Sequence, residues 1–298
     1  MQLLIGRALT DSQEFDKAIP FLNNVHSAKR GAKWQKAWAQ AYLGICMFVR
    51  GEYEASKTFL SKCVADDVTP NCTKFAVKRM TLFGFNARYH GFDTKSSEHF
   101  VFHIESDAKN SIHLNDYISR REQAYDAISE FFGSKLEYKV NYFAWLSKSS
   151  LKAEIGAISG FAAPEYGIVH ATIDQTAGHE IVHLFVQSKQ KTALINEGLA
   201  VYLNQEHGDL LSEAKEIMKK SSFTEVDIKQ MWETKTNYEV KGFYPIAGAF
   251  VEELIKKGGK DRFLKLVEDQ RFGNAEKIYG SHLLEIISDF ENSLGISD

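Results

Sequence analysis

The sequence is poor in cysteine and proline and has no long apolar run. Its 298 residues include only three cysteines, all in the N-terminal quarter, and four prolines. So few cysteines exclude a small disulfide-rich secreted scaffold. We expect Cys46, Cys63 and Cys72 to be buried reduced thiols, with a Cys63–Cys72 bridge as the alternative. No stretch approaches the roughly 20 apolar residues that cross a bilayer, so we expect no membrane span.

Neither sign of charge dominates the chain. The formal net charge of −3 at pH 7 gives no basic surface for nucleic acid, and we expect no such partner. The 44% hydrophobic and 25% charged residues are typical of a globular chain with one large or two medium domains. The start, MQLLIGRALTDSQEF, lacks the basic region of a signal peptide. The sequence as it stands therefore predicts a cytoplasmic protein.

The motif HEIVH at residues 179–183 carries the most chemical information. Because a helix turns once in about 3.6 residues, His179 and His183 would share one face and could bind one zinc ion together. Glu180 would then reach a water on that ion rather than the ion itself. A core helix with two polar-side histidines is the alternative interpretation. The motif indicates a zinc-dependent peptidase.

A catalytic zinc site needs a third protein ligand. The apolar helix after His183 can run only to about Gln187, and the polar stretch 188–192 predicts a turn. A second helix beginning near Asn196 would bring Glu197, 14 positions after His183, back to the two histidines. On distance alone, Glu206 is a competing ligand.

HEIVH followed by INEGLAVYL at residues 195–203 resembles the gluzincin group of metallopeptidases. The pair is most similar to the bacterial peptidase MA-like families, and the resemblance covers about residues 97–295. Ile195 departs from the pattern, since an aromatic residue or Leu-Pro is frequent there, and this departure concerns packing rather than chemistry.

The resemblance implies a zincin-type domain with one zinc ion per chain. It implies that His179, His183 and Glu197 hold the zinc and that Glu180 is the general base. Similar enzymes also use a tyrosine or histidine from the C-terminal helices to stabilise the oxyanion. Our candidate for this catalytic role is Tyr244, which precedes an apolar helix that should pack against the site. The alternatives are Tyr238 and His282.

His170 lies on a strand expected at residues 167–172. In this fold group such a strand commonly lies along the cleft and presents a free edge to an extended peptide. We interpret His170 itself as a structural residue or as a hydrogen-bond partner of a ligand.

Residues 1–92 contain an internal repeat with a spacing of 38 positions. Its equivalent pairs are Gly6 and Gly44, Phe15 and Tyr53, Ala18 and Ser56, and Leu22 and Leu60. The pattern resembles tetratricopeptide units, whose period is about 34. In such units small residues let two helices approach, and bulky residues fill the gap between them. We expect a tetratricopeptide-like helical domain, with a capping helix at 72–85, that offers a surface for a protein partner. A plain helical bundle is the alternative.

Met1 falls at about the third position of the first repeat. We therefore expect the natural chain to extend further at this end, in which case a periplasmic or cell-envelope location would replace the cytoplasmic one.

Residues 97–298 predict a zinc metallopeptidase domain, so the whole chain should be α+β and predominantly helical. Alternation at 99–105 and strand character at 138–145 and 167–172 indicate a small mixed sheet. A long helix at 112–132 should end near Gly133, and a polar loop is expected at 147–152. After Glu197 we expect helices at about 195–206, 209–220, 225–233, 242–257, 260–270 and 281–293.

These features favour a zinc-dependent peptidase that hydrolyses a peptide or protein substrate. The chain has no G-x-M-E-N exopeptidase motif, which favours an endopeptidase. The alternative is a repeat-based interaction or scaffold protein that has a metallopeptidase-like fold and binds without cutting. Glu180 argues against this alternative, because a non-catalytic site has no chemical need for that carboxylate.

Overall fold

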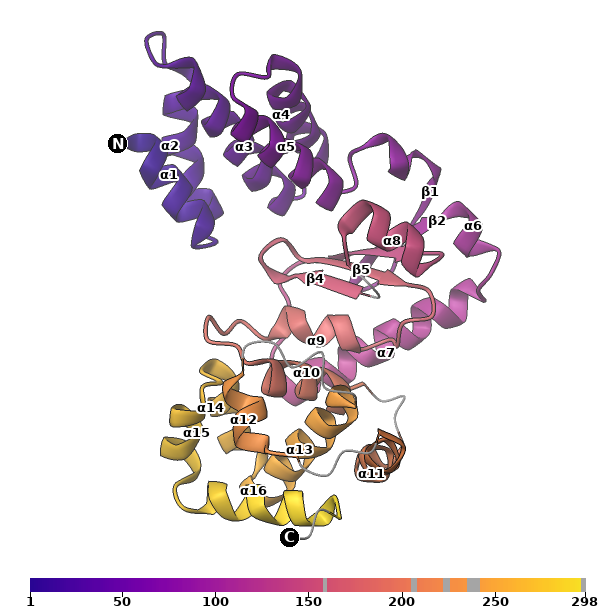
Figure 1. Ribbon diagram of the computed structural model, residues 1–298. Coiled ribbons are helices and arrows are strands. Elements are labelled where there is room, and N and C mark those ends of the chain that lie inside the picture. The colour runs from indigo at the N-terminus through magenta and orange to yellow at the C-terminus, as the bar shows by residue number, and fades with distance from the viewer. Residues whose placement is uncertain (158–159, 205–207, 222–225, 235–241, 296–298) are drawn as a thin grey trace.

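The computed structural model describes residues 1–157, 160–204, 208–221, 226–234 and 242–295. Helices predominate, and a five-stranded mixed sheet lies between the N-terminal and the C-terminal helices (Figure 1). The architecture is α+β, as the sequence predicts. No helix in these ranges is long and apolar enough to cross a membrane.

The N-terminal helices form two packed pairs with a fifth helix beside them. A Cβ on Gly6 would lie 2.6 Å from Leu22, and one on Gly44 would lie 2.7 Å from Leu60, so each glycine lets its pair of helices approach closely. These two contacts are equivalent in the 38-residue spacing of the sequence. The three cysteines of this region are buried free thiols. The helices are α1 (Gln2–Asp11), α2 (Phe15–Ser27), α3 (Lys33–Val49), α4 (Tyr53–Asp66) and α5 (Pro70–Leu82).

The sheet has the order β1-β2-β3-β5-β4. Strands β2, β3 and β5 are parallel, whereas β1 pairs antiparallel with β2, and β4 pairs antiparallel with β5. The sequence predicts β2, β3 and β5 but neither of the two edge strands. The strands are β1 (Phe92–Ser96), β2 (Phe100–Glu105), β3 (Val140–Trp145), β4 (Gly160–Ala163) and β5 (Ile168–Thr172).

Strand β5 has no free edge, so the prediction that residues 167–172 present one to the cleft is wrong. His170 pairs with Phe143 of β3 on one side and with Phe161 of β4 on the other. All five residues of β5 are buried, which suits a strand with neighbours on both sides. The edge belongs to β4, in a glycine- and alanine-rich stretch without a period-two apolar pattern.

One face of the sheet shares a hydrophobic core with the N-terminal helices. Phe143 and Trp145 of β3 belong to the same cluster as the buried residues of α2 to α5. A hydrogen bond also crosses this contact, from Asn141 Nδ2 to the hydroxyl of Tyr53 at 3.2 Å. The N-terminal helices are therefore packed directly against the sheet.

The other face of the sheet shares the larger core with the helices after β2 other than α8, whose Leu151 packs with the N-terminal helices. Phe100 and Phe102 of β2 pack there with Tyr117 and Tyr125 of α7. Helix α7 ends just before Gly133, as the sequence predicts, and Gly133 itself has the left-handed conformation. The helices after β2 are α6 (Ser106–Lys109), α7 (Leu114–Phe132), α8 (Lys148–Ile155), α9 (His179–Phe185), α10 (Ala193–Tyr202), α11 (Leu210–Ser221), α12 (Ile228–Glu233), α13 (Phe243–Gly258), α14 (Lys260–Glu268), α15 (Phe272–Tyr279) and α16 (His282–Ser293), with short 3-10 turns η1 (Ala87–Gly91) and η2 (Pro164–Tyr166).

Two predicted connections are helical. The polar loop expected at 147–152 is mostly α8, because the hydroxyl of Ser147 accepts a hydrogen bond from the N–H of Ser150 at 3.2 Å and caps the helix. Helix α15 lies between the helices expected at 260–270 and 281–293. Its Phe272 and Ala275 are buried, so tertiary packing supports a helix that its glycine obscures in the sequence.

Candidate metal centre

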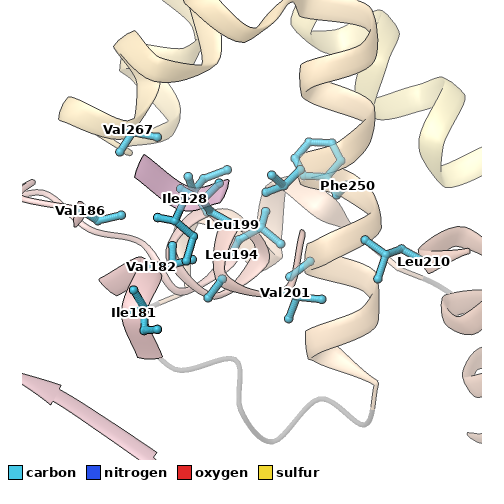
Figure 2. Packing of buried hydrophobic residues seen from close by; sticks show 14 of the residues in the cluster. Ile128, Ile181, Val182, Val186, Leu194, Leu199, Val201, Leu210, Phe250 and Val267 are labelled. Carbon is cyan, nitrogen blue, oxygen red and sulfur yellow. The ribbon is translucent and has the colours of Figure 1, made fainter. Parts of the chain in front are cut away.

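Helix α9 presents two histidines on one face and apolar residues to the core. His179 and His183 are one turn apart, with ring centroids separated by 5.2 Å. Ile181 and Val182 are fully buried, and α9 contacts both α7 and α10. Figure 2 shows these two side chains within the packing that surrounds α10. The core thus fixes the rotation of α9, and this directs both imidazoles to the same side.

Glu197 on α10 completes a cluster with the two histidines. Its Oε2 lies 3.3 Å from Nε2 of His179 and 3.7 Å from Nε2 of His183. Burial by itself raises the pKa of this carboxyl, but hydrogen bonds and charge from both histidines outweigh that effect and hold the pKa well below its usual range. We call His179, His183 and Glu197 the metal triad.

Gly198, the residue after Glu197, lets α10 lie close to α13. A Cβ on Gly198 would meet the carbonyl oxygen of Ala247 at 2.4 Å. The glycine of the NEGLA segment therefore has a packing role. It sets the distance between the helix that carries Glu197 and the helix that begins near Tyr244.

The metal triad fits one zinc ion. Its ligand atoms all lie within 4.8 Å of one another. Zinc–ligand bonds of about 2.0–2.1 Å in tetrahedral geometry separate neighbouring donor atoms by roughly 3.3 Å, close to the two distances measured to Glu197. Two imidazoles and one carboxylate beside a cavity are the donor set of a catalytic zinc site, whereas structural sites close the shell with a fourth protein ligand.

Glu180 lies next to the metal triad, and its side chain is almost completely enclosed. It is 6% exposed, and burial raises its pKa to about 7, with the charge of Glu197 adding to this effect and His179 opposing it. Nε2 of Gln175 donates a hydrogen bond to its Oε1 at 3.5 Å. A carboxyl with this pKa can accept and release a proton near neutral pH.

Asn196 contacts two members of the metal triad and was not predicted from the sequence as a site residue. Its Nδ2 donates to Oε1 of Glu197 at 3.1 Å and lies 3.1 Å from Nδ1 of His183. Its buried Oδ1 has no hydrogen-bond partner. The only feature of the sequence that pointed to Asn196 is its position directly before Glu197.

Tyr244 lies beside the metal triad, as the sequence led us to expect. It is in the first turn of α13, its ring centroid is 6.1 Å from that of His179, and its side chain is 41% exposed. His282 lies elsewhere, on α16, where it contacts Glu285 at 3.0 Å. The other two alternatives, Tyr238 and Glu206, lie outside the described residues.

His170 has a structural role away from the metal triad. Its side chain is fully buried, Nδ1 accepts a hydrogen bond from Trp145 Nε1 at 3.1 Å, and Nε2 donates to the carbonyl oxygen of Leu82 at 3.0 Å. Burial lowers its pKa to about 3, although the bond to Leu82 opposes this. The neutral ring therefore links the sheet to the end of α5.

The metal triad opens into a cavity of about 740 Å³. The free edge of β4 forms part of its wall through Gly160 and Phe161, and Tyr244 lines it as well. The strand edge beside the site is therefore that of β4 and not, as the resemblance implied, that of β5. Neither the scan of protein-family models nor the search of curated proteins finds a match to this chain.

Proposed function

We propose that this protein is a zinc-dependent peptidase that cleaves a peptide or protein substrate in its 740 Å³ cavity. The observation that supports this most is the position of the metal triad, with its ligand atoms within 4.8 Å of one another, beside the enclosed carboxyl of Glu180. Zinc bound there would polarise the scissile carbonyl and make a water nucleophilic near neutral pH.

The chain's own residues have distinct roles in this proposal. Glu180 accepts a proton from the attacking water and passes it to the leaving amine, for which a pKa of about 7 is suitable. The hydroxyl of Tyr244 donates a hydrogen bond to the oxyanion. Asn196 orients Glu197, because its Nδ2 donates a hydrogen bond to Oε1 of that carboxylate.

Family membership and the type of N-terminal repeat belong to the same proposal. HEIVH and NEGLA on consecutive helices support a gluzincin of the peptidase MA-like kind. The equivalent contacts of Gly6 with Leu22 and of Gly44 with Leu60 support tetratricopeptide-like units in residues 1–92, ahead of a peptidase domain at 97–298. We propose that these helices also offer a surface to a protein partner.

The first test is the zinc content of the natively purified protein, measured by elemental mass spectrometry together with its His183→Ala variant. We expect about one zinc ion per chain in the wild type and none in the variant. Hydrolysis of an unfolded protein substrate is then measured on the zinc-loaded wild type. Absence of metal from both proteins, even after zinc is supplied, would contradict the proposal and leave the non-catalytic scaffold as the better interpretation.

A further inference from the structure

A second cavity adjoins the cavity of the metal triad on the side of the N-terminal helices. It has a volume of about 720 Å³ and shares two lining residues, Pro164 and Lys191, with the cavity of the metal triad. Its far wall includes the connection between α3 and α4, at Arg50 and Gly51. The two cavities therefore adjoin at Pro164 and Lys191, and together we call them the groove, which extends from the metal triad to the N-terminal helices.

The exposed aromatic side chains of the described residues gather in this groove. Five large aromatic residues are exposed, and all of them except Trp34 line one of the two cavities. Phe161 and Tyr244 lie in the cavity of the metal triad, whereas Tyr53 and Tyr138 lie in the second one. Exposed aromatic groups concentrated in one concave surface are typical of a binding site, because they bury much apolar area at a small entropy cost.

At the junction of the two cavities the contacts open to a bound polypeptide change from backbone hydrogen bonds to side chains. The free edge of β4 ends at Ala163, and Pro164 follows it without a backbone N–H to donate. A chain that continues past Pro164 must therefore be held by side chains. The aromatic rings of Tyr53 and Tyr138, 37% and 39% exposed, provide such contacts in the second cavity.

We propose that the second cavity binds the unfolded substrate polypeptide on one side of the scissile bond, so that the helical repeats take part directly in substrate recognition. This inference rests on the proposed peptidase function. It commits the substrate to a long, extended chain with apolar or aromatic side chains rather than a short peptide. It also makes the α3–α4 connection part of the recognition surface.

The test measures binding separately from cleavage. Fluorescently labelled β-casein, an unfolded polypeptide rich in apolar residues, is titrated with the zinc-loaded Glu180→Gln protein and followed by anisotropy. In this background we expect Tyr53→Ser and Tyr138→Ser each to weaken binding by about tenfold, as truncation of a buried aromatic contact does. The matched control is Trp34→Ser, which removes the exposed aromatic residue outside the groove, and it should keep the original affinity.

Thermal unfolding shows whether each variant is folded. If one of the two tyrosine variants does not fold, the other still tests the proposal. Equal affinity in all variants would overturn the groove proposal. Absence of β-casein binding would overturn it too, because a site built on aromatic contacts should accept many sequences. Hydrolysis of β-casein by the wild type decides the peptidase function independently. Groove-dependent binding without cleavage would overturn the peptidase function and retain the polypeptide-binding groove.

Discussion

Gly160 and Glu180 approach so closely that a side chain at position 160 would displace the Glu180 carboxyl. A Cβ on Gly160 would lie 2.0 Å from Oε1 and 2.6 Å from Cδ of Glu180. Gly160 belongs to the edge strand β4 and Glu180 to α9, and both line the cavity of the metal triad. The missing side chain at position 160 therefore determines where the carboxyl group of Glu180 can lie.

This contact predicts that Gly160→Ala lowers kcat without loss of zinc. The methyl group would push the Glu180 carboxyl from its position, and a displacement of about 1 Å at a reacting group can reduce the rate by roughly 100-fold. Gly273→Ala is the matched control, because a Cβ there has no atom within 4 Å. Steady-state kinetics and zinc content are measured for both variants. An unchanged kcat in Gly160→Ala would show that the contact does not position the base.

Glu180→Gln should retain zinc and lose hydrolysis. The amide keeps the size of the side chain but cannot accept the proton of the attacking water, so we expect kcat/KM to fall by about 3–5 orders of magnitude. The measurement pairs elemental analysis with a peptidase assay on the same preparation. Turnover at the wild-type level would refute the role of Glu180 as general base.

Glu197→Ala should weaken zinc binding by more than about 100-fold, because it removes a ligand rather than one of the outer partners, whose loss typically costs 10–100-fold. Competition with a chelator gives the affinity of the wild type and the variant. Glu206→Ala is measured alongside, since Glu206 is the competing ligand on sequence distance. A larger loss of affinity in Glu206→Ala than in Glu197→Ala would show that the third ligand is assigned wrongly.

Tyr244→Phe should lower kcat by about 100-fold and change KM much less, because a hydrogen bond to the oxyanion forms only as the reaction proceeds. Tyr202→Phe is a suitable control, since its ring packs against Phe131 and lies outside the residues that line the cavity. Michaelis–Menten parameters are compared for the two variants. Equal and small effects would leave Tyr244 with a packing role only.

The sequence predicts the parts of the site that depend on helical spacing. Four positions separate His179 from His183, so any helix brings the two rings to one face. The return of Glu197 could also be anticipated, because a short polar turn between two apolar helices forces them to be neighbours. Tyr244 followed from the same reasoning about a helix that must pack against the site.

The features that sequence reasoning missed depend on contacts between distant segments. Strand β4 has a glycine and two alanines, which lack the alternation that identifies a strand, and its pairing with β5 decides its structure. The importance of Gly160 comes from a residue 20 positions away. The groove likewise depends on how the N-terminal helices pack against the sheet, which no local pattern encodes.

The environment of His170 makes it a source of acid sensitivity. The ring accepts from Trp145 and donates to Leu82, so a second ring proton would oppose the indole N–H of Trp145. Its pKa is about 3 in the folded protein against an ordinary value of 6.5. Between these values the unfolded chain binds a proton that the folded protein refuses, and stability therefore decreases as the pH falls from 6.5 towards 3.

We expect this histidine to cost about 2 kcal/mol of unfolding free energy at pH 5 relative to pH 7, since one pKa unit corresponds to about 1.4 kcal/mol. His170→Gln keeps one acceptor and one donor but cannot titrate, so its loss of stability between pH 7 and pH 5 should be smaller than that of the wild type by about this amount. Urea unfolding at the two pH values measures the difference. His282→Gln, which removes an exposed histidine, is the control. If wild type and His170→Gln lose equal stability, the proton linkage lies in other groups.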